Sequence, residues 1–370
     1  MNLKELIINK LPQFKDIRRT LHNNAELSNQ EFKTSKIIQN YLASLGLSYK
    51  SLANTGVVAV LNQDTECIGI RADMDALPIN GVFHGCGHDY HMAILLGVAT
   101  ILKDLNINKC IKFIFQPAEE DGGGALPMIN EGVLENPKVT RMIGYHVWPG
   151  LELGAIEATS GPSMGSVDDF RILFKGKGGH GAMPDLCVNP LKPAVEFSYT
   201  LQNYKASQAS TPYVLNLTSI NCGNAPNVVS DEALVMGTLR TFDDSLRNHL
   251  KNEIRKAAAE YATKYGCTHS VTFEDEYPPL INDASITKEF IDITSKLLGK
   301  EKVKPLIPTF AGEDFSYFAQ AVPSVHFRLG IKADGLGELP LHSSNFTAHE
   351  DVIFYGVYII CNYILSLSRS

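Results

Sequence analysis

The sequence lacks several features, and each absence argues against a class of protein. No run approaches ~18 to 20 uninterrupted apolar residues, so we do not expect a membrane-spanning helix or a membrane partner. No cluster of Lys and Arg is present and the formal net charge is -7, so nucleic acid is not an expected partner. Residues 1–21 carry charges throughout and contain no apolar core before a cleavage site, so a secretory leader is not expected.

Cysteine is scarce and odd in number. The seven cysteines are scattered and lie mostly inside apolar segments, which is typical of reduced thiols rather than of a disulfide framework. Together with the missing leader, this predicts a cytoplasmic protein.

The chain also lacks internal repeats. Its 370 residues, 44% hydrophobic and 20% charged, are ordinary for a globular protein and leave room for two domains.

The first third of the chain alternates helix-like and strand-like segments. Helices are expected at residues 2–23, 31–45, 92–102 and 125–132, and strands at 57–61, 67–72, 111–115 and 142–145. The strands are nearly continuous apolar runs separated by helices. This pattern predicts a sheet that is covered on both faces, and therefore an α/β domain.

From about residue 165 the strands alternate polar and apolar residues, as in a sheet with one face open to solvent. Segments between 169 and 274 follow the order strand, helix, strand, strand, helix, strand, which is that of a ferredoxin-like sandwich. Helices and short strands return after 283, as if completing the first sheet. We therefore predict a phosphorylase/hydrolase-like α/β catalytic domain of residues 1–165 and 277–370. An α+β ferredoxin-like domain, residues 166–276, would be inserted in it.

The stretch HGCGHDYH at residues 84–91 contains three histidines, a cysteine and an aspartate. Cys86 and His88 lie between glycines just before an apolar helix-like run, so a loop entering a helix can direct both outward. Thiolate and imidazole are good zinc ligands, and imidazole also suits manganese, nickel and cobalt. Two ligands are too few for a site, so the others must come from elsewhere.

Four more polar clusters follow strand-like segments, where α/β proteins place ligands and catalytic groups. They contain Asp75, the pair Glu119 and Glu120, His146, and His342. Each has an ordinary explanation when taken alone. An Asp before a Pro often only forms a turn, acidic turns are commonly solvated, and a lone His is more often structural.

Together the clusters are more informative, because they supply five metal ligands. Five ligands are too many for one structural zinc and suit two metals that share a water molecule. Adjacent residues of extended backbone point to opposite sides, so one glutamate can bind metal while its neighbour reaches the water. The assigned ligands are Cys86, His88, Glu120, His146 and His342, and Glu119 is assigned as the general base.

Motifs along essentially the whole chain resemble those of the M20 metallopeptidase family in order and spacing. They are RADMDALP, HGCGHDYHM, FIFQPAEE, GYHVWP, KGKGGHGAMP, PNVV followed by GTLRTF, AGEDFS and HSSNF. Within the family they are most similar to the aminoacylase-type amidohydrolases. That group includes hippurate hydrolase, indole-acetyl-amino-acid hydrolases and N-acetyl-diaminopimelate deacetylase.

The resemblance implies two divalent metal ions per subunit, commonly manganese or zinc, with nickel or cobalt as alternatives. It places the same five ligands and Glu119 in the roles given above, and it gives Asp75 a supporting role in catalysis. It also implies that the inserted domain is a lid and dimerisation domain. In that domain His180 matches a histidine that approaches the site across the dimer, while Asn227 and Arg240 match substrate-contacting positions.

Three positions depart from the family pattern. Only residues 80–83 separate Ile79 from His84, so we expect a more open pocket mouth. Asp185 follows Pro184 where many relatives have His, which questions a substrate contact there. Ser344 replaces a common Pro, with little expected effect.

The predicted function is hydrolysis of the amide bond of small N-acyl amino acids, with acetyl as one candidate acyl group, by a homodimer or higher homo-oligomer. A metallo-dipeptidase on the same fold is the nearest alternative, and a non-catalytic metal-binding protein is another. A third alternative is a cysteine hydrolase in which Cys86 is the nucleophile and His88 or His91 the base. That alternative leaves the two glutamates and the distant histidines without a role.

Overall fold

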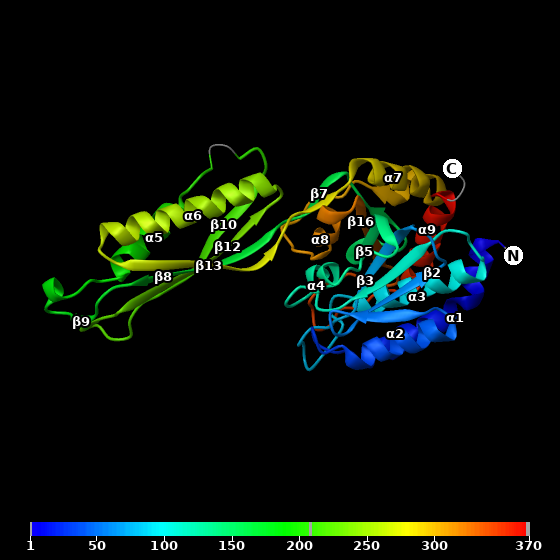
Figure 1. The fold of residues 1–370 in the computed structure, drawn as a ribbon, viewed down its shortest axis with the longest axis horizontal. Helices are drawn as coiled ribbons and strands as arrows, with labels where there is room; N and C mark the ends of the chain where they lie inside the picture. Colours follow the sequence, from blue (N-terminus) through cyan, green and yellow to red (C-terminus); the bar gives the residue numbers. More distant parts are fainter. Residues whose placement is uncertain (1, 207–208, 368–370) are drawn as a thin grey trace. The chain divides into compact units, whose positions relative to one another are not determined.

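The computed structural model describes residues 2–206 and 209–367. The chain forms two units, which are described separately (Figure 1). The first comprises residues 1–163, 281–307 and 314–370, and the second comprises residues 164–280 and 308–313. The short segment 308–313 is a part of the second unit that the sequence pattern did not indicate.

The first unit is built on an eight-stranded sheet with the strand order β1-β2-β4-β3-β5-β16-β6-β15. The four central strands, from β4 to β16, are parallel, whereas β1 and β2 add antiparallel pairings at one side. The strands are β1 (Tyr49–Leu52), β2 (Gly56–Leu61), β3 (Glu66–Asp73), β4 (Ile111–Gln116), β5 (Lys138–Glu152), β6 (Ile156–Glu157), β15 (Val303–Lys304) and β16 (Ser324–Lys332).

Both faces of this sheet are covered, as predicted. All residues of β4 are buried, and so are all but the first of β3, although successive side chains point to opposite faces. Helix α3 packs against α1 and α9, and α4 packs against α8, which contacts β5 and β16. The helices are α1 (Leu3–His22), α2 (Phe32–Ser44), α3 (His88–Asp104), α4 (Ala125–Asn130), α7 (Ala284–Leu298), α8 (Phe315–Ala321) and α9 (Val352–Leu367), with a short 3-10 turn, η2 (Lys300–Lys302).

Helix α3 begins at His88, whereas the apolar pattern predicted a start at Met92. The reason is Gly87, which precedes the helix with φ of 85°, a left-handed conformation that glycine adopts at little cost. Every residue from His88 to Leu102 is buried. The first turn of α3 is therefore polar yet lies inside the protein, which requires specific partners for its side chains.

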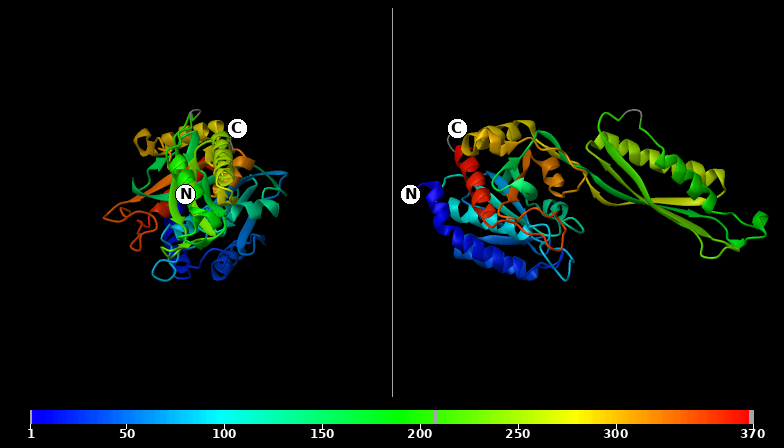
Figure 2. Two further views of the ribbon diagram at one scale, coloured as in Figure 1. Left: turned by 90° about the vertical axis from the view of Figure 1, so that its left-hand side faces the viewer. Right: turned by 180° about the vertical axis from the view of Figure 1, so that it is seen from behind.

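The second unit contains a four-stranded antiparallel sheet with the order β10-β12-β8-β13. Helices α5 and α6 lie together on one face of it (Figures 1 and 2). Alternate residues of β12 are buried, so the opposite face is more open, as the alternating sequence predicted. The elements are β8 (Val167–Lys175), α5 (Leu191–Gln202), β10 (Tyr213–Asn221), β12 (Glu232–Thr241), α6 (Asp244–Lys264) and β13 (Thr268–Tyr277).

Two small sheets complete the structure. In the second unit β9 (Gly179–His180) pairs with β11 (Val228–Val229), close to the 3-10 turn η1 (Pro184–Leu186). β7 (Gly161–Met164) pairs with β14 (Leu280–Asn282) where the chain passes between the units. All seven cysteines are free thiols. Among residues 2–206 and 209–367, no helix has the length and apolar character needed to cross a lipid bilayer.

Candidate active site

The loops that follow β3 and β4 meet at one edge of the large sheet. Asp73, the last residue of β3, is paired with Gln116, the last residue of β4, so the loops that follow both strands start at the same level. The backbone N–H of Glu120 donates a hydrogen bond of 2.9 Å to Oδ2 of Asp75. This contact brings together two predicted site residues that lie 45 positions apart in the chain.

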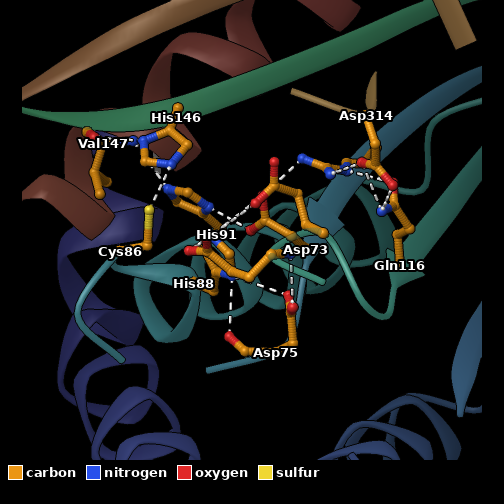
Figure 3. A network of polar contacts seen from close by, with 12 residues as sticks. Asp73, Asp75, Cys86, His88, His91, Gln116, His146, Val147 and Asp314 are labelled. Atoms are coloured by element: carbon orange, nitrogen blue, oxygen red, sulfur yellow. Dashed lines mark hydrogen bonds and ion pairs between the residues drawn. The ribbon is translucent and has the colours of Figure 1, made fainter. Parts of the chain in front are cut away.

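Cys86, His88 and His146 also come together, in part through an arrangement that the sequence did not predict. Strand β5 continues to Glu152, so His146 lies inside a strand and not at its end. Its Nε2 is 3.4 Å from Sγ of Cys86 (Figure 3). His146 Nδ1 donates to the carbonyl oxygen of Val147 at 2.7 Å, which leaves the lone pair of Nε2 directed at the thiol.

His88 is oriented in the same way. Its Nδ1 lies 3.0 Å from the carbonyl oxygen of Asp75, so this nitrogen is the donor and Nε2 faces the other side chains. Nε2 lies 3.7 Å from Oε1 of Glu120 and 4.0 Å from Oε2 of Glu119. The two neighbouring carboxylates therefore both approach one imidazole, and each retains only about a tenth of its surface exposed.

His342 reaches the site from a distant loop. Its Nε2 lies 3.3 Å from Oε2 of Glu120, and its backbone N–H donates to the carbonyl oxygen of Gly85 at 2.9 Å. The side chain is 56% exposed, so this is the open side of the cluster. Its hydrogen bond with Glu120 raises the pKa of His342.

The electrostatics of the cluster favour a bound cation. Burial by itself lowers the pKa of His88, but the carboxylates of Asp73, Asp75 and Glu120 outweigh it and raise that pKa to about 10. Burial and the carboxylates of Glu120 and Glu119 raise the pKa of Cys86 well above its usual value. A thiolate is therefore unfavourable here unless a positive charge lies beside it.

Among the described residues, five sets of donor atoms could each hold a metal ion, and two of these sets consist only of predicted ligands. Within each set the candidate atoms lie within 4.8 Å of one another, and the two sets of predicted ligands share Cys86. Nε2 of His88 and Oε1 of Glu120 are buried and have no hydrogen-bond partner among the residues the structure describes. Sulfur, imidazole and carboxylate donors suit borderline divalent ions. Of the two sets of predicted ligands, one is Cys86, His88 and His146, and the other is Cys86, Glu120 and His342.

A buried network that the sequence analysis did not assign supports these residues. Arg71 donates to Asp73 at 2.7 Å, to Gln116 at 2.8 Å and to Asp314 at 2.9 Å, and it has no exposed surface. His91 Nδ1 bonds Oδ1 of Asp73 at 2.5 Å, and its Nε2 accepts the N–H of Val147 at 2.9 Å. The network thus connects the ends of β3 and β4 to the backbone beside His146 (Figure 3).

Several of these supporting residues carried a sequence signal that was not used. Asp73 and His91 lie inside the RADMDALP and HGCGHDYHM motifs, and Asp314 lies inside AGEDFS. Ser28 and Glu31 carried no such signal, because they precede the first strand and lie outside all of the quoted motifs. Ser28 nevertheless donates to Oδ2 of Asp75 at 2.6 Å, and Glu31 accepts the N–H of Ala118 at 2.9 Å.

The remaining predicted residues lie in the second unit. His180 is exposed in β9, and Asn227 directly precedes β11, with its carbonyl oxygen accepting the N–H of Gly181 at 2.8 Å. Arg240 lies in β12 and donates to Asp169 at 3.3 Å. β12 starts beside the β9–β11 pair, so at ~3.3 Å per residue its start lies roughly 26 Å from Arg240. His180 and Asn227 are neighbours, whereas Arg240 lies near the other end of the sheet.

Comparison with known proteins identifies the family of the chain. Residues 69–366 match peptidase family M20/M25/M40. The chain belongs to this family. Thermostable carboxypeptidase 2 of Saccharolobus solfataricus is 36% identical over 96% of each chain. N-acetyl-L-cysteine deacetylase of Bacillus subtilis is 33% identical, over 93% of this chain and 85% of that protein.

A solved structure of another M20 protein is also similar to this chain. The YXEP protein of Bacillus subtilis, described as a dinuclear metal binding peptidase from the M20 family, has a TM-score of 0.84 with this chain. It is 28% identical, over 97% of this chain and 98% of that one. As an M20 protein with such relatives, the present chain is a metal-dependent hydrolase acting on amide bonds.

Proposed function

We propose that this M20 protein hydrolyses the amide bond of small N-acyl amino acids, with acetyl as one candidate acyl group. The observation that carries the proposal is the position of Glu119 and Glu120, whose carboxylates lie 4.0 and 3.7 Å from the same nitrogen of His88. Glu120 also shares a donor set with Cys86 and His342, and its Oε2 lies 3.3 Å from Nε2 of His342.

The donor sets fit two divalent ions, with manganese or zinc favoured and nickel or cobalt as alternatives. Cys86, His88 and His146 would hold one ion, and Cys86, Glu120 and His342 would hold the other. When bound, such ions lower the pKa of water from near 16 to about 7 and polarise the substrate carbonyl.

Within this scheme Glu119 is the general base. It accepts a proton from the attacking water and returns it to the leaving amine, a role that typically contributes ~10²- to 10⁴-fold to the rate. Asp75 supports the site by receiving the N–H of Glu120 through Oδ2, while its own carbonyl oxygen orients His88. A fixed imidazole and a fixed loop hold the donors where the reaction needs them.

We further propose that the catalytic domain, residues 1–165 and 277–370, carries an inserted ferredoxin-like lid and dimerisation domain, residues 166–276. Arg240 lies roughly 26 Å from the start of β12, and His180 lies in the separate β9–β11 pair beside that start. One small substrate therefore cannot touch both residues of a single subunit. If both contact it, together with Asn227, they come from different subunits. An apolar stripe on α5 suits such pairing, since Leu191, Val195 and Tyr199 are 41%, 50% and 74% exposed.

The alternatives differ in their support. A peptidase acting on dipeptides is the nearest, because the relative from Saccharolobus solfataricus is named a carboxypeptidase. A cysteine hydrolase is disfavoured by the raised pKa of the Cys86 thiol. A non-catalytic metal-binding protein leaves Glu119 unexplained. Cytoplasmic location stays a prediction from the sequence.

The test is a substrate panel. The protein would be loaded separately with manganese, zinc, nickel and cobalt, and release of free amine would be measured on N-acetyl and N-benzoyl amino acids and on dipeptides. We expect turnover of N-acyl amino acids to exceed that of dipeptides. Faster turnover of dipeptides would replace the proposal with the dipeptidase. No turnover with any of the four metals would overturn both.

A further inference from the structure

The loop that carries Glu119 and Glu120 is held by carboxylates from three different parts of the first unit. The backbone N–H of Ala118 donates to Glu31, that of Glu120 to Asp75, and that of Ala125 to Asp314, each at 2.9 Å. All three acceptors are fully buried. Charge-assisted hydrogen bonds of this kind are roughly twice as strong as neutral ones, so each fixes one point of the loop.

The contact at Ala118 fixes the most strained of these points. Ala118 has φ of 54°, a left-handed conformation that costs a non-glycine residue roughly 1–2 kcal/mol. It is 1% exposed, and it directly precedes Glu119. Its carbonyl oxygen also accepts the N–H of Gly124 at 3.0 Å, which closes the loop on itself. Both backbone groups of Ala118 therefore have partners that specify this conformation.

Glu31 is free to make this contact because another residue caps its helix. Glu31 is the N-cap of α2, yet its side chain makes no capping bond there. Glu26 does so instead, accepting the N–H groups of Lys33 and Thr34 at 2.8 and 2.9 Å. The Glu31 carboxylate is thus directed away from its own helix.

The other contacts of Glu31 lock its carboxylate in place. Oε1 accepts the N–H groups of Asn29 and Ala118 at 3.0 and 2.9 Å. Oε2 accepts the hydroxyl of Thr55 at 2.7 Å. A fully buried carboxylate with three donors is a rigid support, since moving it would leave a buried charge without partners.

We propose that Glu31 is a positioning residue for catalysis, which acts through Ala118 to set the direction of Glu119. The inference rests on the proposed role of Glu119 as general base. Glu120 has its own anchor at Asp75, so loss of the Glu31 contact should misdirect Glu119 while the metal ligands stay in place. A purely structural role would instead lower stability without separating these effects.

The test compares Glu31→Ala and Glu31→Asp with Glu31→Gln and Glu26→Ala. Aspartate keeps a carboxylate but is one methylene too short to reach Ala118, so it removes the loop contact with a smaller loss of volume than alanine, and the Tm of both variants shows whether they fold. The glutamine amide can accept both N–H groups and donate to Thr55, so it should restore function. Glu26→Ala is the matched control, because it removes a helix cap from the same segment without touching the loop.

We expect kcat of Glu31→Asp to fall at least tenfold, with KM and metal content per chain within twofold of wild type. Glu31→Gln should stay within about threefold in kcat, and Glu26→Ala should lower Tm with little change in kcat. Unchanged kcat in Glu31→Asp, equal losses in Glu26→Ala, or parallel loss of metal would overturn the proposal. Glu119→Gln is measured alongside, because full activity in that variant would refute the general base itself.

Discussion

The Sγ atom of Cys86 lies 3.4 Å from Nε2 of His146, although the two residues are 60 positions apart. A thiol beside an imidazole could be a nucleophile with its base or two ligands of one metal ion. Burial and the nearby carboxylates of Glu120 and Glu119 raise the pKa of the thiol, which favours the metal ligand because a cation would stabilise the thiolate.

The first prediction separates these two roles of Cys86. Protein purified without chelator should contain more than one metal ion per chain by elemental analysis, and a chelator should abolish its activity. Iodoacetamide should inactivate the metal-loaded enzyme slowly, because Cys86 is only 6% exposed. Rapid inactivation by iodoacetamide combined with indifference to the chelator would instead identify Cys86 as a nucleophile.

The second prediction concerns the neighbouring glutamates. Glu119→Gln removes the proton acceptor but keeps the size of the side chain, so metal should stay bound while kcat falls by ~10² or more. Glu120→Gln replaces an anionic ligand with a neutral one, so metal affinity should drop. Excess metal should rescue only Glu120→Gln. Rescue of the other variant would exchange the roles, and normal activity in both would leave the loop as an acidic turn.

The third prediction concerns the glycine between Cys86 and His88. In Gly87→Ala the new Cβ would lie 2.5 Å from Cγ2 of Val147, and the left-handed backbone would cost roughly 1–2 kcal/mol. Both predicted ligands should therefore shift, and competition with a chromogenic chelator should show at least tenfold weaker metal binding. Gly85→Ala is the control, since its Cβ would meet mainly the flexible ends of Ile79 and Leu77. Equal losses in both variants would contradict the argument.

The fourth prediction is a pH dependence of stability that arises from His326. Burial, with smaller contributions from Arg71 and Arg328, lowers the pKa of His326 to about 3. The unfolded state, with a pKa near 6.5, binds the proton first as the pH falls. The contribution of His326 to the free energy of unfolding is therefore fully present only above pH ~6.5. As the pH falls further, this contribution declines by about 1.4 kcal/mol per pH unit until the folded pKa is reached.

Urea unfolding of metal-free protein between pH 7 and 5 checks this prediction. His326→Leu removes the titrating group, so its free energy of unfolding should fall less steeply with decreasing pH than that of wild type. The comparison uses slopes, because the substitution also changes packing beside Phe315. Identical slopes would show that His326 does not titrate as expected.

The fifth prediction concerns the apolar stripe on α5. Tyr199→Lys places a charge at its most exposed position and should convert a dimer to a monomer in light scattering, without lowering Tm by more than a few degrees. Phe32→Lys is the control, because Phe32 is 59% exposed on the first unit, outside the proposed interface. A wild-type monomer with full activity would argue against a cross-subunit role for His180.

Much of the fold followed from hydrophobic pattern. The continuous apolar strands of the first unit predicted a sheet covered on both faces, and the alternating strands of the second unit predicted a sheet with one open face. The start of α3 was misplaced by four residues, because its first turn is polar and buried. Pattern cannot indicate burial for residues whose polar partners come from other segments. β5 is longer than predicted because polar residues flank its apolar run, at residues 138–141 before it and at His146 after it.

The sequence by itself determined which residue types are available and which stretches bear chemistry, because motifs and periodicity are local properties of the chain. Only the tertiary structure decided that Cys86 belongs to both donor sets, that Arg71 links Asp73 to Asp314, and that Glu31 holds Ala118. Those relationships depend on strand register and on loops that meet at a sheet edge. A hydrogen bond between residues 87 positions apart, such as that of Glu31 with Ala118, leaves no periodic trace in the chain.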